Sequence, residues 1–176
     1  MSNKWKIFTG VSVFVFILVG AYWYIDNEYA NFFTVYDKRR DGLLGIKDLS
    51  QREASFRAHP SIEECVFLLE KYYFLGNISE ESGRRFKFTP DEVRLSGNMA
   101  LMYGQRCIDL GVDKSPAGWL VRYWLADLQM KIGSPTEAEE NLRVAIRLDS
   151  KKTLKASGWI EGSKLEDLYR KLESAK

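Results

Sequence analysis

The sequence predicts an all-α protein in which a small helical domain follows one helix long enough to cross a membrane. Three observations support this prediction. Residues 7–25 form one apolar run without a charge. Beyond that run, signals typical of helix starts recur along the chain, and no stretch competes seriously as a strand. With 176 residues, the chain has room for one globular core beside the apolar helix, but not for a second core.

The apolar run is predicted to be a single transmembrane helix over 7–25. At 1.5 Å per residue it spans roughly 28 Å, about the thickness of the hydrocarbon layer. Trp5 precedes the run and an aromatic triplet at 22–24 ends it, as in interfacial aromatic belts. A signal peptide cleaved after Ala21 is the alternative. We therefore expect a single-pass protein in the lipid bilayer, with residues 1–6 as a short tail.

The charges that flank the apolar run decide its orientation. Lys4 and Lys6 lie on one side, and the cluster at 38–40 lies on the other. The short basic tail is closer to its membrane edge, which favours a cytoplasmic amino terminus and an extracytoplasmic domain, periplasmic or lumenal. The two flanks are nearly balanced, so the opposite orientation stays open.

The rest of the chain divides into a membrane-proximal helix–loop–helix connector over 26–60 and a helical domain over 61–176. Thr89, Pro90 and Glu92 form a capping-box pattern, and Ser134 with Glu137 forms a second. Three glycines are predicted stops: Gly76, Gly111 and Gly133. Together these signals predict helices over 61–76, 90–110, 116–132, 135–149 and 160–175.

The helices predicted at 116–132 and 135–149 form a hairpin. Leu125, Leu128 and Ile132 are expected on the first helix to meet Ala138, Leu142, Ala145 and Ile146 on the second. The two alanines matter because antiparallel helices approach closely only where a small side chain faces the neighbour.

In a 34-residue frame that opens at Trp119, this hairpin resembles a tetratricopeptide repeat. The matching positions are Leu125, Ala126, Gly133, Ala138, Leu142, Ala145, Leu148 and Asp149. Arg122, Gln129 and Ser150 stand where the family prefers Trp, Tyr and Pro, so the copy is divergent. The resemblance implies a TPR-like domain over 61–176 with a carboxyl-terminal capping helix. An unrelated helical bundle is the alternative.

The resemblance also implies a partner-binding groove along the inner face of the first helices. The residues of 116–132 expected to face it are Leu120, Tyr123, Asp127 and Met130. Burial of Tyr123 and Met130 under a neighbouring helix is the alternative. Tyr72 and Tyr73 are further candidates, because an aromatic run at 72–74 cannot bury all its members in one direction.

A weaker resemblance is to an EF-hand loop over 37–48. Asp37, Asp41 and Asp48 stand at its first, fifth and twelfth positions. Arg39, however, stands at the third position, which must give an oxygen to the ion, and Asp48 is shorter than the glutamate that the loop requires. We therefore predict a turn here and no metal site.

No pattern in the chain indicates catalysis. The single histidine, His59, precedes a proline, and neither Cys65 nor Cys107 belongs to a CxxC motif. Both cysteines lie in apolar helical runs and are expected to be buried thiols, able to bridge if the domain is outside the cytoplasm. No phosphate-binding glycine loop or nucleophile elbow is present. We predict no enzyme activity, no cofactor and no small-molecule substrate.

Protein binding is the function that remains. Apart from Lys4 and Lys6 the chain carries 24 basic and 24 acidic residues, so no polybasic nucleic-acid surface is expected. We expect a non-catalytic, membrane-anchored interaction or scaffold subunit that binds other protein subunits of a larger membrane complex. The alternative is a free-standing tethered receptor or co-chaperone that captures peptide segments in its groove.

Overall fold

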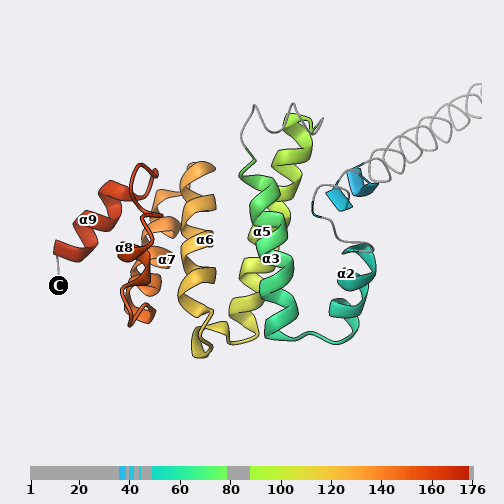
Figure 1. Ribbon diagram of the computed structural model, residues 1–176, viewed down its shortest axis with the longest axis horizontal. Helices are drawn as coiled ribbons and strands as arrows, with labels where there is room; N and C mark the ends of the chain where they lie inside the picture. The colour runs from blue at the N-terminus through green and yellow to red at the C-terminus, as the bar shows by residue number, and fades with distance from the viewer. Residues whose placement is uncertain (1–35, 39, 42–43, 45–48, 79–87, 175–176) are drawn as a thin grey trace, which may run out of the picture. The chain divides into compact units, whose positions relative to one another are not determined.

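The computed structural model describes residues 36–38, 40–41, 44, 49–78 and 88–174 (Figure 1). The chain separates into two compact units, Met1–Lys47 and Asp48–Lys176. The predicted transmembrane segment, 7–25, lies outside the described residues. Within the described part of the chain, no helix is both long enough and apolar enough to cross a membrane. Every regular element described there is helical, which confirms the all-α class.

The described residues of the second unit form a series of helices joined by turns and loops. The helices are α2 (Leu49–Ala58), α3 (Ile62–Gly76), α5 (Pro90–Asp109), the 3-10 turn η1 (Val112–Lys114), α6 (Gly118–Lys131), α7 (Pro135–Leu148), α8 (Thr153–Ala156) and α9 (Glu166–Ser174). Four of the predicted helices are confirmed to within two residues at each end. The last helix begins at Glu166 instead of 160, because Gly158 and Gly162 adopt left-handed conformations, φ 70° and 71°, and turn the chain before it.

Side-chain caps explain where two of these helices begin. Thr89 and Glu92 form the predicted capping box: the Glu92 N–H donates to Thr89 Oγ1 at 3.3 Å, and the Thr89 N–H donates to Glu92 Oε2 at 2.7 Å. Ser61 caps α3 by accepting from the Glu64 N–H at 3.2 Å. The second predicted box is wrong, because the Ser134 side chain caps nothing. Its ψ of 68° departs from the 154° and 158° of the two working caps.

Two helical hairpins form the centre of this unit. Figure 1 shows α3 beside α5 and α6 beside α7, with α6 next to the first pair. Small residues allow the close approaches. A Cβ on Gly76 would lie 2.7 Å from the Gly97 Cα in α5, and a Cβ on Gly104 would lie 2.5 Å from Leu125 Cδ2 in α6. Gly76 is the last residue of α3, so the predicted end of that helix is confirmed, and Gly76 is also a helix-packing residue.

A disulfide joins the two helices of the first hairpin. Cys65 in α3 and Cys107 in α5 are bonded, with their Cα atoms 5.6 Å apart, and both residues are fully buried. The sequence left open whether these cysteines pair. Their positions are opposite one another because α3 and α5 run antiparallel, so residues near the start of one helix meet residues near the end of the other.

The second hairpin packs through the predicted alanines. Ala138, Leu142 and Ala145 of α7 have no exposed surface, and Leu125 and Leu128 of α6 are almost as buried. Ile132 is the exception, since 60% of its surface is exposed. It follows the last residue of α6, where the chain leaves the helix toward the left-handed Gly133, φ 85°. The prediction that Ile132 joins this contact is therefore wrong.

Candidate partner-binding face

The four groove residues predicted on α6 do share one face of that helix. Leu120, Tyr123, Asp127 and Met130 follow one another at intervals of three or four residues, which places them along one stripe. We call this row the α6 stripe. Its middle is buried, with Tyr123 5% and Asp127 4% exposed, while Leu120 and Met130 at its ends are partly exposed.

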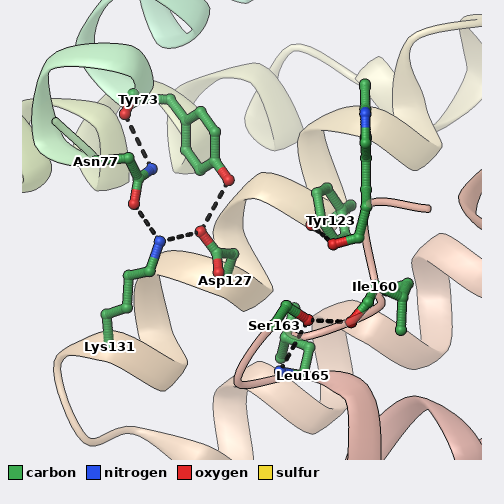
Figure 2. Close-up of polar contacts among 9 residues, drawn as sticks. Tyr73, Asn77, Tyr123, Asp127, Lys131, Ile160, Ser163 and Leu165 are labelled. Carbon is green, nitrogen blue, oxygen red and sulfur yellow. Dashed lines mark hydrogen bonds and ion pairs between the residues drawn. The ribbon is translucent and has the colours of Figure 1, made fainter. Parts of the chain in front are cut away.

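Asp127 belongs to a polar network between the two hairpins (Figure 2). The Tyr73 hydroxyl of α3 donates to Asp127 Oδ2 at 2.8 Å, and Lys131 Nζ donates to the same oxygen at 2.6 Å. Lys131 also donates to Asn77 Oδ1, and Asn77 Nδ2 donates to the Tyr73 carbonyl at 2.9 Å. These four residues close a ring of contacts between α3 and α6, which we call the inter-hairpin network.

The network neutralises a carboxylate that has almost no access to water. Lys131 supplies the compensating charge, and its side chain is partly exposed. Burial raises the pKa of the Tyr73 hydroxyl well above its usual value, and the adjacent Asp127 charge and hydrogen bond raise it further. Tyr73 therefore stays a neutral donor, and its ring stacks on Trp124 with centroids 5.3 Å apart. Asp127 does not line an open groove as predicted, because it holds the two hairpins together.

Tyr123 is covered by the loop between α8 and α9. Its ring stacks on Trp159 with centroids 5.8 Å apart, and its hydroxyl donates to the Trp159 carbonyl at 3.1 Å. The Trp119 ring is also near that indole, with centroids 6.1 Å apart. Burial raises the pKa of Tyr123 to about 12, and the Asp127 charge raises it too. Burial was one of the two possibilities the sequence left for Tyr123, although a loop provides the cover instead of a helix.

Hydrogen bonds and two buried side chains hold the part of the loop that follows Trp159. Ser163 Oγ donates to the Ile160 carbonyl at 2.7 Å and accepts from the Leu165 N–H at 3.2 Å (Figure 2). Ile160 and Leu165 are both buried, at 5% and 0% exposure. The loop is thus attached by two apolar side chains and leaves Trp159 about half exposed, at 47%.

The aromatic run of α3 is divided between core and surface. Tyr72 is 1% exposed, and its hydroxyl donates to Glu53 Oε1 at 2.6 Å. The Tyr103 hydroxyl donates to the same oxygen at 3.0 Å, and the two tyrosine rings stack. Tyr72 is therefore a core residue that a partner cannot reach in this structure. Phe74, with 53% of its surface exposed, is the member of the run that faces outward.

Phe74 is a surface residue that the sequence analysis did not name as a contact residue. The signal was present in the sequence, because the run at 72–74 required one ring to point away from the core. Which ring it would be depends on how α3 rotates against α2 and α5. Glu53 fixes that rotation by accepting from Tyr72. Phe74 of α3 and Leu120 and Met130 of α6 are apolar residues that are at least partly exposed, and we call these three residues the accessible face.

Arg122 lies at the centre of a polar chain that joins η1, α6 and α7. Its Nε and Nη2 donate to the Asp113 carboxylate at 2.9 and 2.6 Å, and its Nη1 donates to Asn141 Oδ1 at 2.7 Å. Asn141 in turn donates to Gln129 Oε1 at 2.9 Å. The hydrogen bonds from Arg122 lower the pKa of Asp113. A polar chain of Asp113, Arg122, Asn141 and Gln129 thus links η1, α6 and α7.

Metal ligands do not gather anywhere in the described residues, where no group of three such side chains could hold an ion. In the EF-hand-like loop, Arg40 pairs with Asp37 at 3.0 Å and with Asp41 at 2.9 Å. Both carboxylates therefore face a guanidinium. Arg39 and Asp48 of that loop lie outside the described residues.

No protein-family model, curated protein or solved structure matches the chain.

Proposed function

We propose that this protein is a non-catalytic, membrane-anchored scaffold subunit that binds other protein subunits of a larger membrane complex. In this proposal the segment 7–25 is the anchor, and the helical domain provides the contact surface. The observation that carries the proposal is the inter-hairpin network, because it links α3 of the first hairpin to α6 of the second.

The order of the helices supports a TPR-like reading of residues 61–176. Two antiparallel hairpins follow one another, and α6 contacts both α3 and α5. The terminal helix α9 packs on α7, the position expected for a cap. Stacked hairpins of this kind provide extended surfaces that suit protein partners better than small molecules.

The disulfide supports an extracytoplasmic domain. Stable disulfides form in the periplasm, the secretory pathway and other oxidising compartments, and they are rare in the cytosol. The bond between Cys65 and Cys107 is fully buried, which suits a structural bond better than an exchanging one. A periplasmic or lumenal domain also agrees with the orientation that Lys4 and Lys6 favour.

Phe74, Leu120 and Met130 are the proposed contact residues. An apolar ring that is half exposed beside a rigid network loses little conformational entropy when a partner covers it. Permanent subunits also bury large apolar areas, to which a transmembrane helix contributes. Tyr73 and Asp127 support this face from beneath, and Tyr123 does so through Trp159.

Native electrophoresis of mildly solubilised membranes tests the proposal. We expect the wild-type chain to migrate within an assembly much larger than its own mass, and Phe74→Ala to release a fraction of it. Met102→Ala is the matched control, because Met102 on α5 is equally exposed, at 51%, and is not one of the proposed contact residues. A wild-type chain that migrates alone would overturn the subunit role.

A tethered receptor that captures peptides is the second candidate. One observation favours it: Tyr123 on α6 already binds a non-helical segment of the chain itself, by stacking and by a hydrogen bond to the Trp159 carbonyl. A free peptide could use the same two contacts. A receptor would migrate alone in native gels and bind its peptides in proportion to their concentration, whereas a permanent subunit would not.

A further inference from the structure

Residues 151–164, which include α8 and the loop after it, differ in charge from the rest of the helical domain. They contain four lysines and one acidic residue, Glu161. Residues 49–150, by contrast, carry 15 acidic and 13 basic side chains. We call residues 151–164 the basic segment. It is a local cationic feature on a domain that is otherwise slightly acidic.

The lysines of the basic segment are exposed and largely free of partners. All four, Lys151, Lys152, Lys155 and Lys164, are exposed. Within the described part of the chain, only Lys155 approaches an acid, with its Nζ 4.0 Å from Glu173 Oε2. Elsewhere in the domain, basic side chains such as Arg122 and Lys131 are held in close ion pairs at 2.6 Å. The charge of the segment is therefore available to an external anion.

The structure holds this segment in a defined position. The Asp149 carboxylate accepts from the N–H groups of Thr153 at 2.9 Å and Leu154 at 2.7 Å. Leu154 is 1% exposed and fixes α8 to the core, as Ile160 fixes the following loop. Between these two anchors lies Trp159, half exposed. The segment thus presents an indole ring and a cluster of lysines on a stable support.

We propose that the basic segment docks on the surface of an anionic lipid bilayer. Lysines near such a surface are attracted by its negative potential, and tryptophan is enriched at the interface between headgroups and hydrocarbon. This inference rests on the proposed anchor at 7–25. The 23 residues of 26–48 reach at most about 80 Å, so the anchor keeps the domain near the bilayer and raises its effective concentration there.

Full-length protein in lipid nanodiscs tests this docking. The bilayer is either phosphatidylcholine alone or a mixture with phosphatidylglycerol, and brominated lipids quench any indole at the interface. Trp159→Phe identifies the part of the emission that Trp159 contributes. The test variant is Lys151→Gln with Lys152→Gln and Lys155→Gln. The control variant, Arg57→Gln with Arg106→Gln and Lys114→Gln, removes the same charge from exposed positions outside the segment.

We expect quenching of Trp159 in the mixed bilayer and little in phosphatidylcholine. Each lysine removed should weaken docking by about fivefold, while the control variant should behave like the wild type. Equal quenching in both bilayers, or none in either, would overturn the proposal. The proposal would also be overturned if the test variant showed the same quenching as the wild type. The same holds if the only effect of the test variant were the loss of an acidic protein partner. Extraction with alkaline carbonate tests the anchor separately, because a chain can stay in the membrane pellet without its domain docking.

Discussion

The two hairpins of the helical domain are closed in different ways. In the first, α3 and α5 are joined by a connection of more than ten residues, most of it outside the described part of the chain, and by the disulfide between Cys65 and Cys107. In the second, α6 and α7 are joined by a turn of three residues that contains the left-handed Gly133, and they pack through Ala138 and Ala145 without a covalent link.

The difference follows from the entropy of closing a loop. A three-residue turn leaves two antiparallel helices little freedom before they pack, so alanine contacts suffice. A longer connection makes closure less favourable, and a cross-link removes that freedom from the unfolded chain. A disulfide between cysteines separated by 42 positions in the sequence is expected to stabilise the fold by about 4 kcal/mol. The first hairpin should therefore depend on oxidation, and the second should not.

Removal of the disulfide should have the largest effect. The double variant Cys65→Ala with Cys107→Ala should lower the free energy of unfolding by about 4 kcal/mol. Urea unfolding with and without reductant measures this loss, and hydrogen exchange should show faster exchange in α3 and α5 than in α6 and α7. If the double variant has the same free energy of unfolding as the parent, the first hairpin does not depend on its disulfide.

Overpacking of the second hairpin should have the next largest effect. Ala145 has no exposed surface, so Ala145→Leu forces extra methylene groups between α6 and α7, at a loss of about 1 to 3 kcal/mol. Ala54→Leu, at an exposed position in α2, is the control and should change stability by less than about 0.5 kcal/mol. If Ala145→Leu and the parent have the same melting temperature, close packing through the alanines does not hold this hairpin together.

Disruption of the inter-hairpin network should lower stability by an amount similar to that of overpacking, and the loss should involve both hairpins. Asp127→Ala should destabilise the domain by about 1 to 3 kcal/mol, because it leaves the Tyr73 hydroxyl and Lys131 without their partner. This reverses the expectation for an open groove, where the change would leave folding intact. Tyr73→Phe keeps the stacking on Trp124 and removes only the hydrogen bond.

A double-mutant cycle with Tyr73→Phe and Asp127→Ala isolates the coupling between the hairpins. Asp109→Ala, at an exposed acidic position in α5, is the control. Additive effects of the two network variants would show that the network does not join the hairpins energetically.

Alkaline pH should weaken the packing around α6, with no effect near neutrality. The pKa of Tyr123 is raised to about 12 in the folded domain, against about 10 in an unfolded chain. The neutral Tyr123 phenol therefore makes its full contribution to the free energy of unfolding below about pH 10. This contribution is lost as the pH rises toward about 12. Urea midpoints across this range should fall for the wild type and fall less steeply for Tyr123→Phe. If the urea midpoints of the two proteins fall equally with pH, ionisation of Tyr123 is not the cause of the loss of stability.

The sequence by itself determined the helical class and most helix boundaries. Short-range signals explain this success. Thr89 with Glu92, and Ser61 before α3, act within one turn of backbone, so the residues that form each cap are neighbours in the sequence. The same holds for the left-handed Gly111 and Gly133 and for the small residues at Ala138 and Ala145.

Only the tertiary structure decided which of the candidate surface residues are accessible. The burial of Tyr72 depends on Glu53, nineteen residues away, and that of Asp127 depends on Tyr73, 54 residues away. Tyr123 is hidden by Trp159, 36 residues further along. Helical periodicity shows that Leu120, Tyr123, Asp127 and Met130 share one face, but not what covers that face. The cover comes from contacts between segments distant in sequence, and local patterns carry no record of those contacts.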